Sequence, residues 1–267
     1  MRALVITVEP DEVELASDAL WALGVVAIEE RAAGDAVELW TSLGDDFEPS
    51  GLPWAWRRQY VDDDVVDTWR QFAKPVEVVP GLIVKPAWVA LKVAAGTKVV
   101  SIEPGSTFGA GDHPTTLLCL RTVERFVEPG ATVLDVGCGS GVLAITAKVL
   151  GAGRAVGIDI SPAAVPVTLA NAAANGVDVE VSTAPLADVD GSFDLVVANI
   201  LAPALVGLSA ELRRVLAPGG ALVVSGVLAE AARHQHVLDA LAPLEVDRID
   251  VLDVWAAITL RHEVTTR

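Results

Sequence analysis

Short apolar segments alternate with segments of helical period between residues 132 and 228, and this alternation constrains the fold more than any other feature of the sequence. The apolar segments are residues 132–137, 154–160, 177–183, 193–200 and 220–227. The helical segments are residues 140–150, 162–175, 203–216 and 229–241. Apolar strands joined by helices form a parallel sheet that helices cover on both faces. The sequence therefore predicts an α/β fold with a doubly wound, Rossmann-like sheet.

The main domain is predicted to span residues 76–267. Ahead of the alternation it has strand-like segments at residues 78–89 and 98–102 and a helix at residues 113–127. Behind it, two further strands are expected at residues 245–252 and 254–261. Because no copy of the whole strand–helix block is visible, we expect a single doubly wound sheet.

Residues 1–45 form a separate block with a β-α-β-β pattern. Residues 4–8 alternate as a strand does, and a helical pattern from Asp11 ends at Gly24, where a helix C-cap belongs. Two strands follow at residues 25–29 and 36–43. A sheet this small cannot bury both of its faces alone. We expect a small α+β domain that packs on the main domain or on a protein substrate.

Residues 46–75 are predicted to be an aromatic-rich linker. Residues 44–53 read GDDFEPSGLP, a composition typical of loops. Aromatic side chains then cluster at Trp54, Trp56, Tyr60, Trp69 and Phe72. We expect these rings to anchor the small domain, and contact with a substrate is the alternative.

Charge and composition narrow the range of partners. The chain has 19 Lys and Arg against 36 Asp and Glu, a net charge of −17, which disfavours nucleic acid and favours a lysine-rich protein. Charged residues, Gly or Pro interrupt every apolar stretch before about 18 residues, so we expect no membrane span. No signal-peptide pattern follows Met1, so we expect a cytoplasmic protein. Cys119, Cys138 and the four His residues show no metal-ligand spacing, so no metal is predicted.

A strand runs directly into a glycine-rich turn at Gly137, Gly139 and Gly141, and a helix follows. Without side chains, such a turn lets a ligand lie against the backbone at the carboxyl edge of the sheet. The acid that ends the next strand, Asp159, can accept hydrogen bonds from two ribose hydroxyls. Gly139, Gly141 and Ala144 also satisfy the dinucleotide pattern, so the spacing fits S-adenosylmethionine, a dinucleotide, or a turn without a ligand.

Asn199 ends the strand at residues 193–200, at the same predicted edge. Its side-chain oxygen and a nearby main-chain carbonyl can accept hydrogen bonds from an amine, whose lone pair then faces an electrophilic methyl group. This favours methyl transfer from S-adenosylmethionine to nitrogen, with Asn199 as the catalytic residue that orients the amine. An oxidoreductase would need a second half-sheet and a partner for hydride transfer, and neither is apparent. A simple turn residue is the other interpretation of Asn199.

Residues 103–116 combine a glycine-rich loop with Thr115 and Thr116 at the start of a helix. Free N–H groups and hydroxyls at such a position suit an anion, and the methionine part of the cofactor carries a carboxylate. N-capping of the helix by Asp112 or Thr115 is the alternative.

Together, PGSTFGAGDHPTT, VLDVGCGSGVLAI with GIDI, and VVANILAPAL resemble the bacterial ribosomal protein L11 methyltransferase family. The resemblance covers nearly everything from about Trp69 to the end. It implies a class I S-adenosylmethionine-dependent enzyme with a small N-terminal recognition domain, and cofactor contacts at Thr116, Gly137, Asp159 and Asn199. The chain departs from the family at Ala110, where a threonine is usual, and in a shorter N-terminal region.

We therefore expect a monomeric protein N-methyltransferase that uses S-adenosylmethionine and acts on lysine or N-terminal amines, with ribosomal protein L11 as the favoured substrate. Gly139 joins the expected cofactor contacts because it lies in the glycine turn. No acid–base residue is predicted. The alternatives are another protein or a small molecule as substrate, an NAD-dependent oxidoreductase, and a nucleotide-binding module without turnover.

Overall fold

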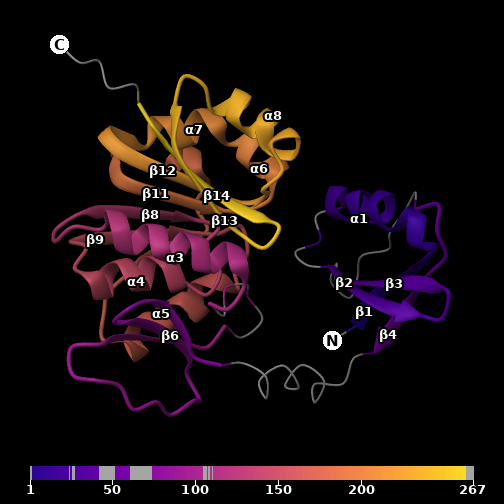
Figure 1. Cartoon of the computed structure of the whole chain (residues 1–267), viewed down its shortest axis with the longest axis horizontal. Coiled ribbons are helices and arrows are strands. Elements are labelled where there is room, and N and C mark those ends of the chain that lie inside the picture. Colours follow the sequence, from indigo (N-terminus) through magenta and orange to yellow (C-terminus); the bar gives the residue numbers. More distant parts are fainter. Residues whose placement is uncertain are drawn as a thin grey trace. The chain divides into compact units, whose positions relative to one another are not determined.

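The computed structural model divides into two compact units, Met1–Ala73 and Lys74–Arg267, which are coloured along the chain in Figure 1. The structure describes residues 2–23, 25, 28–41, 52–60, 74–104, 107, 109 and 111–262. Each unit has a hydrophobic core of its own.

The N-terminal unit is a four-stranded antiparallel sheet in the order β2-β3-β1-β4. Its elements are β1 (Arg2–Val8), α1 (Val13–Ala22), β2 (Ile28–Ala33), β3 (Ala36–Thr41) and β4 (Trp56–Tyr60). Leu4 and Ile6 of β1 pack with Ala16 and Leu20 of α1. Alternate residues of a strand lie on one face of the sheet, and residues four apart in a helix lie on one face of the helix. The apolar face of β1 can therefore pack against the apolar face of α1.

The strand β4 lies inside the predicted linker, so the predicted boundary at residue 45 is wrong. Arg2 pairs with Tyr60 and Ile6 with Trp56, which makes β4 the second neighbour of β1. A central strand has backbone donors and acceptors along both edges, and β3 can satisfy only one of them. Trp69, Phe72 and residues 42–51 lie outside the described residues.

The larger unit contains a seven-stranded sheet in the order β10-β9-β8-β11-β12-β14-β13. Its strands are β8 (Thr132–Val136), β9 (Arg154–Ile158), β10 (Glu180–Ser182), β11 (Phe193–Asn199), β12 (Leu216–Leu228), β13 (Glu245–Leu252) and β14 (Trp255–Arg261). The strands from β10 to β12 are parallel, and β14 and β13 complete the sheet with antiparallel pairings. The predicted α/β fold is confirmed.

Helices cover both faces of this sheet, as Figure 1 shows. One face carries α3 (Pro114–Phe126), α4 (Val142–Leu150) and α5 (Ala164–Ala174), and the other carries α6 (Ala202–Gly207), α7 (Ser209–Arg214) and α8 (Ala231–Leu241). The single helix predicted at residues 203–216 is thus two helices that meet at Leu208.

A second, three-stranded sheet, which the sequence does not predict, precedes the single doubly wound sheet in the chain. It consists of β5 (Val76–Val79), β6 (Leu82–Pro86) and β7 (Lys98–Ile102), in that order. The segment predicted as one strand at residues 78–89 folds back on itself, because Gly81 takes a φ of 87° that favours a turn. Its edge strand β7 leads into the loop that begins at Glu103 and ends at α3.

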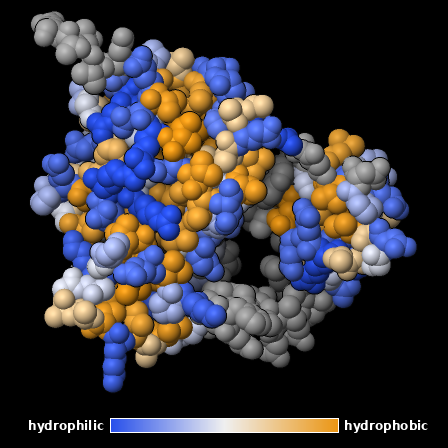
Figure 2. Space-filling view, in the orientation of Figure 1, coloured by the Kyte–Doolittle hydropathy of each residue, from blue (hydrophilic) through white to orange (hydrophobic). Residues whose placement is uncertain are grey.

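Hydrophilic residues cover much of the face drawn in Figure 2, and apolar residues group over β13 and β14. There Val246, Ile249, Val251 and Val254 are exposed. Among the described residues, no helix is long and apolar enough to cross a membrane.

Candidate active site

The turn after β8 favours glycine at three positions. Gly137, Gly139 and Gly141 have φ values of 76°, 51° and 79°, in the left-handed region that L side chains avoid. A Cβ atom on Gly137 would lie 2.3 Å from Cγ2 of Ile200, and one on Gly141 would lie 2.6 Å from Cγ2 of Thr168. The backbone of this turn is therefore open to a ligand and closely packed against the protein behind it.

Asp159 lies beside the turn, where the sequence predicts it. The Gly139 N–H donates to Oδ2 of Asp159 at 2.9 Å, and the Ser161 N–H donates to Oδ1 at 2.8 Å. Each carboxylate oxygen keeps a further lone pair for another donor. The two backbone bonds thus hold a half-buried carboxylate in a fixed position at the end of β9.

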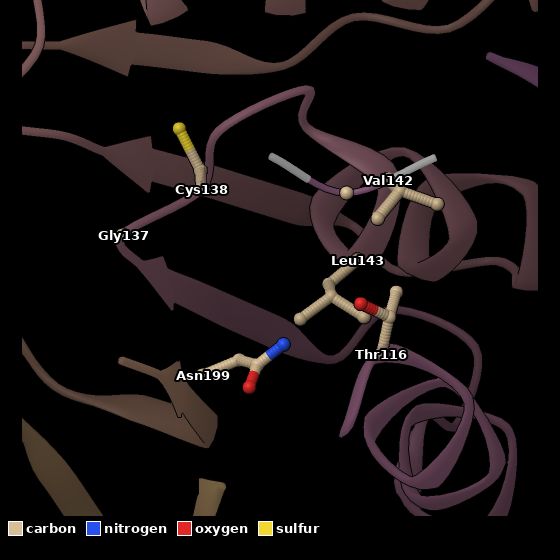
Figure 3. Close-up of a pocket in the computed structure, with 7 residues that line it drawn as sticks. Thr116, Gly137, Cys138, Val142, Leu143 and Asn199 are labelled. Atoms are coloured by element: carbon tan, nitrogen blue, oxygen red, sulfur yellow. The ribbon is translucent and has the colours of Figure 1, made fainter. Parts of the chain in front are cut away.

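Three of the predicted positions line one pocket at the carboxyl end of the sheet (Figure 3). Thr116 comes from α3, Gly137 from the glycine turn and Asn199 from the end of β11. The remaining lining residues are Gly109, Cys138, Val142 and Leu143. In Figure 3 the Asn199 amide points toward the space beside Leu143 and Thr116. The pocket therefore joins an amide and a hydroxyl with the start of the glycine turn, where Gly137 is half-buried.

Two buried polar atoms in this region lack a hydrogen-bond partner among the described residues. They are Oγ1 of Thr116 and Oδ1 of Asp135. The other carboxylate oxygen of Asp135 accepts a hydrogen bond from the Ala144 N–H at 3.2 Å. Burial raises the pKa of Asp135 to about 7, although the Ala144 bond opposes this shift. An orphaned buried acceptor is costly unless a ligand or water satisfies it.

Asp135 is not among the site residues predicted from the sequence, although a local signal for its burial is present. Asp135 is a charged residue within β8, whose other residues are Thr132, Val133, Leu134 and Val136. An acid in a strand that helices cover on both faces is expected to be buried and to need partners.

The start of α3 differs from the alternative interpretation, in which Asp112 or Thr115 caps the helix. His113 is the N-cap residue, and its Nδ1 accepts a hydrogen bond from the Thr115 N–H at 3.3 Å. Burial lowers the pKa of His113, and its ring packs edge-on against Trp255 at 5.4 Å. Ala110 lies outside the described residues, as does Phe108.

The loop before α3 is fastened to the glycine turn. The Ser140 hydroxyl donates to the Gly109 carbonyl at 2.6 Å. A Cβ atom on Gly109 would lie 2.8 Å from the same Ser140 oxygen, so glycine permits this close approach. The two segments that contribute Gly109 and Gly137 to the pocket lining are therefore directly bonded to each other.

These residues fit S-adenosylmethionine. A glycine-rich backbone turn lies beside a carboxylate that can accept two ribose hydroxyls, and the unpartnered Thr116 hydroxyl in the pocket lining suits the polar methionine end. The sheet and this site define a class I S-adenosylmethionine-dependent methyltransferase.

Comparison with known proteins identifies the family. A family model described as Ribosomal protein L11 methyltransferase (PrmA) matches residues 34–263. The chain therefore belongs to the ribosomal protein L11 methyltransferase family, as the resemblance implies. Neither an NAD-dependent oxidoreductase nor a module without turnover is consistent with this family.

Individual relatives agree. The ribosomal protein L11 methyltransferase of Pelotomaculum thermopropionicum is 42% identical over 207 residues, 76% of this chain and 67% of the relative. That of Geobacter metallireducens is 47% identical over 178 residues, 67% of this chain but only 58% of the relative. The crystal structure of a ribosomal protein L11 methylase from Lactobacillus delbrueckii subsp. bulgaricus is similar with a TM-score of 0.65 and 34% identity, covering 71% of this chain and 98% of that one.

Proposed function

We propose that this protein transfers methyl groups from S-adenosylmethionine to lysine or N-terminal amines of ribosomal protein L11. The observation that carries the proposal is the meeting of Thr116, Gly137 and Asn199 in one pocket, in a chain of this family. Asp159 and Gly139 are assigned to the ribose side of the cofactor, and Thr116 to its methionine side.

The chemistry of the bound cofactor is that of a sulfonium, which offers an electrophilic methyl group. Asn199 acts on the other reactant. Its Oδ1 atom accepts an N–H bond from the amine and so directs the nitrogen lone pair toward the methyl group. Alignment of two reactants in this way accounts for a large part of the rate in such a reaction.

The amine must lose a proton before it can react. Among the described residues of the pocket there is no carboxylate or imidazole. We propose that water accepts this proton. The apolar wall formed by Val142 and Leu143 disfavours an ammonium ion and so lowers the pKa of a lysine side chain that enters the pocket. One proton leaves and one methyl group arrives, so the product is a methylated amine and a neutral thioether.

The N-terminal unit is assigned to recognition of the protein substrate, and the acidic balance of 36 acids against 19 bases favours a basic partner. We propose that the protein acts as a monomer in the cytoplasm, where ribosomal proteins are made.

Intact-mass spectrometry tests this function. The full chain is incubated with S-adenosylmethionine and purified ribosomal protein L11, and we expect L11 to gain the mass of one or more methyl groups. The Asn199→Ala variant and an L11 sample with chemically blocked amines are the controls, and both should gain little. If calorimetry shows cofactor binding while L11 stays unmodified, the substrate assignment is wrong.

A further inference from the structure

One face of α5 carries polar side chains into the interior. Thr168 and Asn171 are 0% and 3% exposed, and Asn175 follows at the C-cap, one turn after Asn171. Residues three and four apart share a helix face, so these side chains form one row. A buried amide within a helix is unfavourable unless its hydrogen bonds are satisfied.

The Asn171 amide binds two separate segments. Its Oδ1 atom accepts from the Glu103 N–H at 2.9 Å, and its Nδ2 group donates to the Glu103 carbonyl at 3.0 Å. The same Nδ2 group donates to the Ser140 carbonyl at 2.9 Å. One side chain therefore joins the start of the loop before α3 to the glycine turn.

The neighbouring row members do not join these two segments, since Asn175 reaches β7 and Thr168 reaches the glycine turn alone. Asn175 pairs with Ser101 through a bond from the Ser101 N–H at 2.8 Å and one to its carbonyl at 2.7 Å. Its Nδ2 group also donates to the Asn171 carbonyl at 2.8 Å. Thr168 donates to the Gly139 carbonyl at 3.1 Å. Asn171 is thus distinguished from Asn175 by its bond to the glycine turn.

We propose that Asn171 is a positioning residue that sets the distance between the two segments enclosing the cofactor pocket. This inference rests on the proposed function. Gly109 lines the pocket from the loop that Asn171 holds at Glu103, and Gly137 lines it from the turn that Asn171 holds at Ser140. The bond from Ser140 to Gly109 joins the same two segments again, closer to the pocket.

The energetic reason lies in what remains after the amide is removed. The Ser140 carbonyl and the two backbone groups of Glu103 lose these partners. The two segments are then no longer held at the separation that the ligand needs, and part of the binding free energy is spent on ordering them. We therefore expect loss of the Asn171 amide to weaken cofactor affinity. It should not act directly on the reacting atoms, because Asn171 does not line the pocket.

The test compares Asn171→Ala with Asn175→Ala in the full chain. Both variants remove an amide that pairs with the backbone near β7, but only the first releases the glycine turn. Calorimetry with S-adenosylmethionine should give an affinity at least ~10-fold weaker for Asn171→Ala, because about three hydrogen bonds are lost, and little change for Asn175→Ala. Thermal unfolding is measured in parallel, and both variants should lose stability.

The outcomes separate this inference from the proposed function. Equal affinities for the two variants, or an affinity loss that merely follows the loss of Tm, would overturn the inference alone. An unaltered chain that binds no S-adenosylmethionine would overturn the proposed function and this inference with it. If Asn171→Ala does not fold, Asn171→Ser and Asn175→Ser replace the pair, and the same order of affinities is expected.

Discussion

Ile200 occupies the space that any side chain at position 137 would need, with its Cγ2 atom 2.3 Å from the place of a Cβ on Gly137. The backbone of Ile200 is confined in the same way, since its carbonyl oxygen lies 2.5 Å from the place of a Cβ on Gly226. Two glycines from neighbouring strand ends therefore enclose the residue after Asn199. The turn that carries the proposed amine-orienting amide is therefore packed directly against the turn that we propose binds the cofactor.

Gly137→Ala should lower both Tm and affinity for S-adenosylmethionine. A positive φ costs an alanine about 1–2 kcal/mol, and the contact with Ile200 adds to this cost. Gly130→Ala is the matched control, because Gly130 has a φ of 87° and nothing within 4 Å of its Cβ position. Calorimetry should show normal cofactor binding for the control. Similar affinities in the two variants would mean that the contact with Ile200 does not matter.

Asp159→Ala should weaken S-adenosylmethionine binding at least ~10-fold, because charge-assisted hydrogen bonds contribute about 1.5–3 kcal/mol each. The side chain also accepts bonds from Gly139 and Ser161, so Tm should fall somewhat as well. Isothermal calorimetry measures the affinity. Unchanged binding would remove Asp159 from the cofactor site.

Asn199→Ala should reduce kcat more than cofactor affinity. An interaction that forms chiefly on the way to the transition state appears in kcat, and the proposed bond from Asn199 to the amine is of this kind. Turnover on L11 at saturating cofactor and calorimetry on the same sample give the two quantities. A collapse of affinity with normal kcat would make Asn199 a cofactor contact only.

Asp135→Asn should stabilise the protein without cofactor by an amount that grows with pH. The folded-state pKa of Asp135 is about 7, against an ordinary value of 3.8. Below the ordinary value both states carry the proton, and as pH rises to about 7 the unfolded chain releases it first, which favours unfolding. The asparagine variant does not titrate, so the difference in Tm should increase from about pH 4 to about pH 7. A difference independent of pH would contradict the raised pKa.

Removal of residues 1–73 should leave cofactor binding nearly normal and abolish methylation of a protein substrate. The unit Lys74–Arg267 has its own core and contains every residue assigned to the cofactor. Binding surface remote from the reacting atoms positions a large substrate, so its loss affects turnover. Calorimetry and the mass assay on L11 measure the two effects. A truncated protein that still methylates L11 at the full rate would make the N-terminal unit dispensable for recognition.

Local patterns predict much of this molecule. The strands from β8 to β12 appear where apolar runs alternate with helical periods, and Gly137 and Asp159 end their strands at one edge because parallel strands share that edge. These features depend on residues close together in the chain, so they can be read without knowledge of the tertiary structure.

The missed features depend on pairings between distant residues. The strand β4 is the second neighbour of β1, and the paired residues of the two strands lie fifty or more positions apart in the sequence. The role of Asn171 follows from Glu103, which lies 68 residues before it. The orphaned oxygen of Asp135 becomes visible only in the structure, because the sequence indicates a buried acid in β8 but not which groups lie within hydrogen-bond reach of it.

The amides on α5 also change what β7 offers to other molecules. β7 is an edge strand, and such a strand normally presents free backbone groups that can template association with another chain. Here the N–H and carbonyl groups of Ser101 and Glu103 are already bonded to Asn175 and Asn171. Two side chains thus take the place of a neighbouring strand, and an incoming β-strand would find the backbone groups of residues 101 and 103 already bonded.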